Sequence, residues 1–133
     1  MKTYERILER LPKILERLSM KTASGVPIIV EGKKDASALT RLGITGEFIK
    51  VKEGGKVLED RLGTIRCREA VILVDFDEHG TEIAKEISRI LESYDCKPDL
   101  TIWRNLRALV RKDIKDVEGL PSYLESLKKK MEG

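Results

Sequence analysis

The sequence predicts an α/β protein in which a mainly parallel four-stranded sheet lies between two layers of helices. Short apolar runs, such as residues 27–30 and 70–74, alternate with amphipathic helical patterns from Pro27 onward. An uninterrupted apolar run followed by a helical pattern is typical of a strand that is buried on both faces. Because each helical crossover returns the chain in the same direction, the strands are expected to be parallel.

The length and composition indicate one globular domain. At 133 residues, the chain can bury a core without disulfide or metal staples, so we expect residues 1–133 to form a single domain. Charged residues make up 37% of the chain, above the usual quarter, but the net charge is only +3. Such a balance does not by itself indicate a nucleic-acid-binding protein, so any such argument depends on local clusters.

The cysteine content and hydropathy point to the cytoplasm. Cys67 and Cys96 are too few for a disulfide framework or a zinc site, and we expect them to be free thiols. No apolar stretch approaches the roughly 20 residues that span a bilayer, and the first ten residues are charged rather than signal-like. We therefore expect a cytoplasmic protein without a membrane partner, and the sequence leaves its oligomeric state open.

The remaining elements follow from periodicity and turn residues. Residues 4–19 carry leucine and isoleucine at helical spacing, which predicts an amphipathic helix that packs on the sheet. Lys97 and Pro98 are expected to form a turn. The strands are expected at 27–30, 47–51, 70–74 and 99–103. A helix is expected to start at Lys34 or Asp35 and to end at Gly43, and further helices are expected at 56–62, 81–93, 105–110 and 121–131.

Acidic residues follow two of the predicted strands at the point where each strand ends. Glu31 follows the first strand, and Asp75 and Asp77 follow the third. Neighbouring strands lie about 4.8 Å apart, so these carboxylates are expected to meet in one crevice and share a hydrated divalent cation such as Mg²⁺. The alternative is that Asp77 or Glu78 only caps the following helix.

These motifs resemble the Toprim domain of topoisomerases, bacterial primases and the ribonuclease that matures 5S ribosomal RNA. The matching features are a strand ending in Glu31-Gly32 with Asp35-Ala36 shortly after, and a strand ending in Asp75-x-Asp77-x-x-Gly80. The likeness covers residues 26–104, with 105–131 as a helical extension, and the chain looks like the small stand-alone Toprim proteins of archaea. It implies a Rossmann-like fold.

The resemblance also implies roles for the acidic residues. Glu31 matches a glutamate that acts as a general acid or base or as a metal ligand, and Asp75 and Asp77 match the aspartates that hold magnesium. One or two Mg²⁺ ions are expected, and Mn²⁺ is expected to substitute. Gly32 and Gly80 would allow a close backbone approach, although turn residues need no such function.

Four lysines are expected at the same edge of the sheet. Lys33, Lys34, Lys52 and Lys56 fall in or beside the loops that follow the predicted strands. They would neutralise the phosphates of a nucleic acid, DNA or RNA. The alternative is that they are ordinary solvated lysines.

The expected function is magnesium-dependent cleavage or processing of phosphodiesters. The chain lacks the additional tyrosine-bearing domain of topoisomerases and the zinc-binding part of primases, whereas a nuclease needs little besides the acidic residues. One alternative is a non-catalytic module that binds metal and nucleic acid, or serves as an accessory subunit. A third class, a small-nucleotide-binding domain, lacks a GxGxxG or GxxxxGK motif.

Overall fold

Four parallel strands form a single sheet in the order β2-β1-β3-β4. This computed structural model describes residues 1–52, 62 and 66–133. The strands are β1 (Ile28–Val30), β2 (Phe48–Lys50), β3 (Glu69–Leu73) and β4 (Lys97–Asp99). β1 pairs with β3 in the register Ile28↔Val71 and Val30↔Leu73. The two apolar runs of the sequence are therefore the two central strands, and their residues are almost completely buried.

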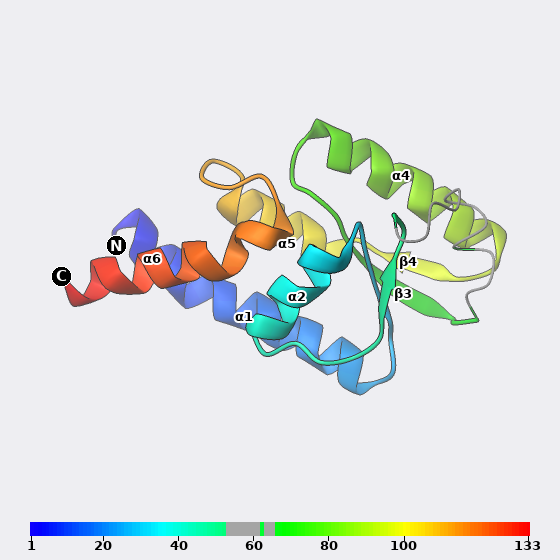
Figure 1. Ribbon diagram of the computed structural model, residues 1–133, viewed down its shortest axis with the longest axis horizontal. Coiled ribbons are helices and arrows are strands. Elements are labelled where there is room, and N and C mark those ends of the chain that lie inside the picture. The colour runs from blue at the N-terminus through cyan, green and yellow to red at the C-terminus, as the bar shows by residue number, and fades with distance from the viewer. Residues whose placement is uncertain (53–61, 63–65) are drawn as a thin grey trace.

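Helices cover both faces of the sheet, which gives the predicted three-layer α/β/α arrangement. The helix α4 packs on β3 and β4 from one side, whereas α2 and α5 contact the sheet from the other side, where α1 and α6 also lie (Figure 1). The α-helices are α1 (Thr3–Ala23), α2 (Lys33–Arg41), α4 (Glu78–Ser93), α5 (Thr101–Val110) and α6 (Leu120–Glu132). A short 3-10 helix, η2 (Val117–Gly119), precedes α6.

The region around Lys97–Trp103 differs from the prediction. Lys97 and Pro98 are not a turn but part of β4, and Thr101 to Trp103 begin α5 instead of ending a strand. Pro98 is tolerated because β4 is an edge strand, where one missing backbone donor need not interrupt a ladder. Asp99 starts the helix by accepting a hydrogen bond from the Thr101 backbone N–H at 2.9 Å. The β-branched and aromatic residues of 99–103 favoured a strand locally, and packing against β3 overrode that preference.

The other elements lie close to their predicted positions. The N-terminal helix is longer than predicted, and its apolar stripe, which includes Leu11 and Leu18, joins the same core as the sheet. The predicted helix 56–62 lies outside the described residues except for Leu62, which is helical and buried. Among the described residues, no helix has both the length and the apolar character needed to cross a lipid bilayer.

Candidate functional site

The carboxyl ends of β1 and β3 bring Glu31 and Asp75 into direct contact. Because Val30 pairs with Leu73, the residues that follow the two strands lie side by side. The backbone N–H of Asp75 donates a hydrogen bond of 2.8 Å to Oε2 of Glu31, across 44 positions of sequence. The prediction that these two segments are neighbours is therefore confirmed.

Glu31 is a buried carboxylate with a lysine partner. Its relative exposure is 3%, and Oε1 lies 2.8 Å from Nζ of Lys52, which follows β2. The two groups form an ion pair, but they are not aligned as a hydrogen bond, so Oε1 has a charge partner without a directed donor. The contact with Glu31 raises the pKa of Lys52, against the opposing effect of burial. Glu31 is thus held by β2 and β3 together.

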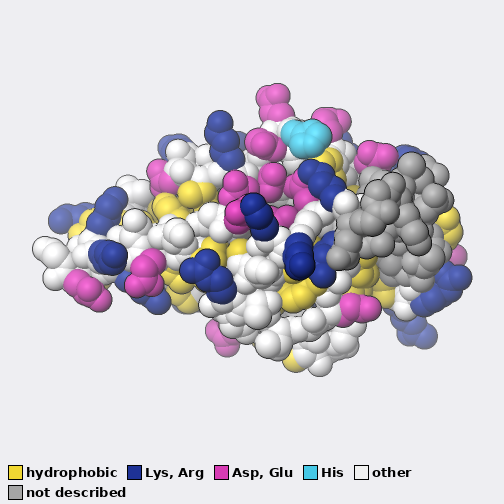
Figure 2. All heavy atoms as spheres, viewed as in Figure 1, with side chains coloured by type: hydrophobic (Ala, Val, Ile, Leu, Met, Phe, Trp, Pro, Cys, Tyr) yellow, Lys and Arg dark blue, Asp and Glu magenta, His cyan; other side chains and the backbone are white. Residues whose placement is uncertain are grey.

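A crevice of about 270 Å³ opens beside these residues, lined by carboxylates and lysines. Figure 2 shows acidic side chains gathered on this face, with Lys and Arg side chains around them. Besides Glu31 and Asp75, the charged residues that line the crevice are Lys33, Lys34, Asp35, Lys52, Asp116 and Glu118. Three of the four lysines predicted at this edge are therefore present, and Lys56 lies outside the described residues.

Asp75 lies in strongly unfavourable surroundings for a carboxylate. Burial raises its pKa to about 7, and the negative charges of Glu31, Asp35, Asp116 and Asp77 contribute to the same shift. Burial also raises the pKa of Asp35, and the negative charges of Glu31, Glu118 and Asp116 raise it further. A carboxylate among other carboxylates favours a bound proton or a bound cation, because either one relieves the repulsion.

Asp77 begins α4 as its N-cap. Its Oδ1 accepts a hydrogen bond of 2.8 Å from the backbone N–H of Gly80, which is the capping alternative considered for this residue. Asp77 does not line the crevice, although its charge contributes to the raised pKa of Asp75. Its role as a metal ligand remains a prediction.

The two glycines of the motif differ in their surroundings. A Cβ on residue 80 would overlap the backbone carbonyl of Asp75, so only glycine lets the first turn of α4 approach the end of β3. Gly32 has extended backbone and open space around its Cβ position, and its N–H donates to Oδ2 of Asp35 at 3.0 Å. The close approach at Gly80 is therefore to the protein's own backbone.

The helix α5 and the segment after it fix the loop that carries Asp75. The indole Nε1 of Trp103 donates to the carbonyl oxygens of Val74 and Asp75 at 3.1 and 3.2 Å. Nε of Arg107 donates to the carbonyl of Phe76 at 3.1 Å, and its guanidinium lies 5.8 Å from the Trp103 ring centroid. The N–H of Phe76 donates to the carbonyl of Lys115 at 2.7 Å. These bonds hold the backbone on either side of the Asp75 carboxylate in one orientation.

Comparison with known proteins gives a family. The sequence matches no family model. It is 37% identical over 128 residues to a UPF0292 protein of Methanosarcina acetivorans, covering 96% of this chain and 88% of that protein. A UPF0292 protein of Thermococcus kodakarensis is 40% identical over 117 residues, which are 88% of this chain and 82% of the relative. The chain belongs to the UPF0292 family.

A solved structure shares the fold of this UPF0292 member. A putative protein from Aquifex aeolicus superposes with a TM-score of 0.67 over 81% of this chain and 95% of its own, at 24% sequence identity. At that identity the likeness concerns the fold alone.

Three acidic residues that line the crevice were not among the predicted site residues. Asp35 entered the sequence analysis only through the resemblance, whereas Asp116 and Glu118 were missed. Asp116 is the N-cap of η2, accepts a hydrogen bond of 2.8 Å from Gly119 N–H, and is brought to the crevice by the packing of η2 on α2. The spacing Asp116-x-Glu118-Gly119 was the available signal, but it resembles any helix cap.

The carboxylates of the crevice are of a kind that suits a hard divalent cation. Carboxylate oxygens are the ligands that Mg²⁺ prefers, and the buried Oε1 of Glu31 has no directed donor. Among the residues that the structure describes, no three or more Asp, Glu, His or Cys side chains converge as a metal-binding group. Lys52 provides a positive charge 2.8 Å from Oε1 of Glu31.

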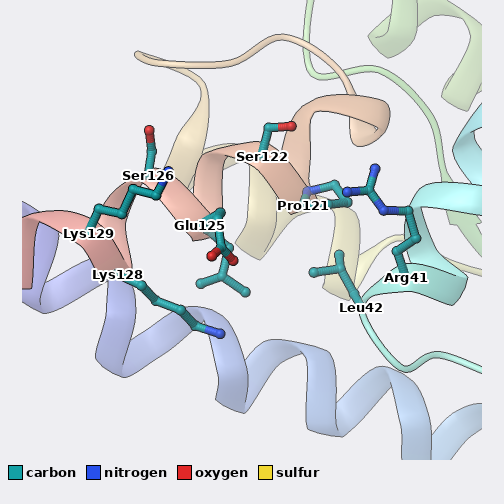
Figure 3. Close-up of a pocket in the computed structure, with 9 residues that line it drawn as sticks. Arg41, Leu42, Pro121, Ser122, Glu125, Ser126, Lys128 and Lys129 are labelled. Atoms are coloured by element: carbon teal, nitrogen blue, oxygen red, sulfur yellow. The ribbon is translucent and has the colours of Figure 1, made fainter.

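A larger hollow of about 460 Å³ lies at the opposite end of α2 from the crevice (Figure 3). It is bounded by the C-terminal end of α2, with Arg41, and by α6, with Glu125, Lys128 and Lys129. Among its described lining residues Glu125 is the one carboxylate, so it lacks the concentration of acidic side chains present at the carboxyl end of β3.

Proposed function

We propose that the crevice between β1 and β3 is the magnesium site of a Toprim-type protein that acts on nucleic acid by cleaving or processing phosphodiesters. The observation that supports this most directly is the position of Asp75. It stands at the carboxyl edge of a parallel sheet, where ligands of α/β proteins bind, and its pKa is raised to about 7 by burial and by four other carboxylates. Such a concentration of like charge is favourable once a cation is bound.

The proposed ligands are Asp75, Asp77 and Glu31, together with Asp35. When bound, Mg²⁺ would neutralise the charge that develops on a phosphoryl group and align the attacking and leaving oxygens. The number of ions, one or two, and their replacement by Mn²⁺ belong to the same proposal.

The lysines on the rim of the crevice are suited to binding a substrate that carries phosphate groups. Lys33 and Lys34 are exposed in the first turn of α2, and the Lys52 side chain is 59% exposed beside Glu31. Their ammonium groups can reach phosphate oxygens while the carboxylates hold the cation. The free thiols of Cys67 and Cys96 fit a protein of the reducing cytoplasm.

Metal binding is tested by thermal unfolding with added Mg²⁺ or Mn²⁺. We expect either ion, at about ten times its dissociation constant, to stabilise the wild type by about 1.4 kcal/mol. Asp75→Asn should abolish this gain, because it removes one ligand and the excess negative charge. Asp95→Asn is the matched control, because Asp95 is exposed and its left-handed φ of 60° suits Asn. No stabilisation of the wild type by either ion would refute the metal site.

A non-catalytic binding module is the second candidate, and the state of Glu31 favours it. One oxygen of Glu31 accepts a hydrogen bond from the Asp75 N–H and the other is paired with Lys52, so both already have partners within the protein. If Mg²⁺ binds but structured RNA, single strands and nicked duplexes stay intact while still binding, the module is correct and the nuclease is not. Glu31→Gln separates the two roles of Glu31: a larger loss of cleavage than of metal affinity indicates proton transfer, and equal losses indicate ligation.

A further inference from the structure

The charges on the exposed face of α1 are sorted by sign. Arg6, Arg10, Lys13 and Arg17 follow one another at intervals of four, three and four residues, which places them in one row along the helix. All four side chains are exposed. We call this row the cationic stripe.

The sorting is unfavourable for the helix itself. A solvated helix usually gains from opposite charges four residues apart, whereas α1 has like charges at Arg6 and Arg10 and at Lys13 and Arg17. Its acidic residues Glu5, Glu9 and Glu16 form a separate row at the same kind of spacing. One contact joins the two rows, between Lys13 and Glu9 at 3.9 Å, with both side chains more than half exposed. Among the described residues, no carboxylate pairs with Arg6, Arg10 or Arg17.

The cationic stripe lines a groove where α1 packs against α5. The groove has a volume of about 350 Å³, and all four cations of the stripe line it together with Ile14. The wall from α5 consists of Asn105, Ala108 and Leu109, and the described residues that line the groove include no carboxylate. The groove therefore offers a row of cations against a nearly neutral wall.

We propose that this groove binds the sugar-phosphate backbone of a nucleic acid, outside the acidic crevice. From Arg6 to Arg17 the stripe rises through eleven steps of about 1.5 Å, which is roughly 16 Å along the helix. Each strand of a B-form duplex carries one phosphate per roughly 3.4 Å of helix axis, so that length matches about five phosphates of a duplex strand and fewer of a more extended single strand. Three of the four cations are arginines, whose planar guanidinium binds phosphate oxygens in a bidentate manner. The inference deepens the function proposed above and rests on it for the choice of nucleic acid over other polyanions.

The groove fits a repeating phosphate chain better than an acidic peptide helix. Docking a helix needs apolar anchors at helical spacing, whereas the neutral wall provides one amide, one methyl group and one leucine. The regular row of cations matches a ligand whose charge repeats along its length. Binding is therefore expected to be strongly salt-dependent and weakly dependent on sequence.

The test is fluorescence anisotropy of labelled single-stranded RNA and DNA twelve-mers with the full chain, over a series of salt concentrations. The stripe variant carries Arg6→Gln, Arg10→Gln, Lys13→Gln and Arg17→Gln, which keeps helix propensity and relieves the like-charge repulsion. The control variant removes the same number of exposed cations elsewhere, Lys112, Lys128, Lys129 and Lys130, also as Gln. The buffer contains EDTA, so the result does not depend on a metal in the crevice.

We expect the stripe variant to bind at least about tenfold more weakly than wild type, and the slope of log K against log salt to fall by about 2 to 3, at roughly 0.7 per lost phosphate contact. The control variant should stay within about twofold of wild type. Equal weakening in both variants, or no weakening in the stripe variant, would overturn the proposal. The proposal would also be overturned if the wild type bound poly-glutamate but neither of the two twelve-mers. The two proposals can fail separately. If the stripe variant loses nucleic-acid binding but Asp75→Asn leaves metal affinity unchanged, the metal site is refuted and the groove is supported.

Discussion

At the scale of single residues, Asp75 links stability to pH. Burial and neighbouring carboxylates hold its pKa at about 7 in the folded chain, against a normal value of 3.8. The folded state thus binds this proton more tightly than the unfolded state. Asp75 therefore contributes stability that is complete below about pH 4 and is lost as the pH rises through about 7.

Urea denaturation in metal-free buffer measures this contribution. Between about pH 5 and about pH 8, we expect the wild type to lose on the order of 1 to 2 kcal/mol more stability than Asp75→Asn, a range reduced for solvent screening of a partly exposed group. Asp95→Asn should follow the wild type. Parallel curves for the wild type and Asp75→Asn would contradict the raised pKa.

Gly80 is the residue on which the geometry of the crevice depends most directly. In Gly80→Ala the new methyl group would overlap the Asp75 carbonyl, so α4 or the end of β3 has to move. We expect a loss of at least about 2 kcal/mol in the free energy of unfolding. Gly32→Ala is the matched control: its Cβ position is open, and the change at the helix N-cap should lower stability by less than about 1 kcal/mol. Equal effects in chemical denaturation would argue against the steric role of Gly80.

At the scale of elements, the strands β3 and β4 begin beside a pair of thiols. Sγ of Cys67 and Sγ of Cys96 lie 3.0 Å apart, and both are free cysteines, as predicted. Burial, together with the contact to Cys67, raises the pKa of Cys96 to about 12, so the partly exposed Cys67 is the thiol expected to react first with a small-molecule disulfide. Exchange would convert the two thiols into one protein disulfide and release two equivalents of the small thiol.

The oxidised form should be more stable than the reduced form. Closing a loop over 29 positions gives at most about 3 to 4 kcal/mol in the chain-entropy treatment. Thiol titration and thermal unfolding before and after oxidation measure this change, with Cys67→Ser as the control that cannot form the bond. Two titratable thiols in the treated wild type would show that the pair does not close.

The sequence was a good guide to elements whose local pattern agrees with their tertiary environment. The apolar runs at β1 and β3 are buried on both faces, so these runs identified two buried strands, and the acids that follow them predicted Glu31 and Asp75 at one edge. The strand order that makes both strands central comes from the structure. The prediction of a strand at 99–103 was wrong, because the β-branched and aromatic residues at the start of α5 pack as a helix against β3. Asp116 and Glu118 could not be found, because their position depends on how η2 docks on α2, a contact between segments about 80 positions apart.

At the scale of the whole molecule, the N-terminal helix belongs to the same core as the sheet. Leu11 of α1 and Ile72 of β3 are both fully buried in one apolar cluster. The interpretation of residues 1–133 as a single domain therefore predicts that α1 and the sheet unfold together.

Leu11→Ala tests this cooperativity. The cavity should lower the free energy of unfolding by about 2 to 5 kcal/mol while leaving one transition. Far-ultraviolet circular dichroism reports all helices, and the fluorescence of Trp103, the only tryptophan of the chain, reports the packing of α5 on β3. Coincident curves from the two probes are expected. An early helical transition that leaves the Trp103 signal unchanged would mean that α1 is an independent unit.

The assembly of the crevice from distant segments has a consequence for synthesis on the ribosome. Its carboxylates come from residues 31, 35, 75, 116 and 118, and the Phe76 backbone N–H is bonded to the carbonyl of Lys115. A nascent chain that has exposed β1 and β3 still lacks the part that completes the rim, so a growing polypeptide cannot present the finished crevice until residues near 119 leave the exit tunnel.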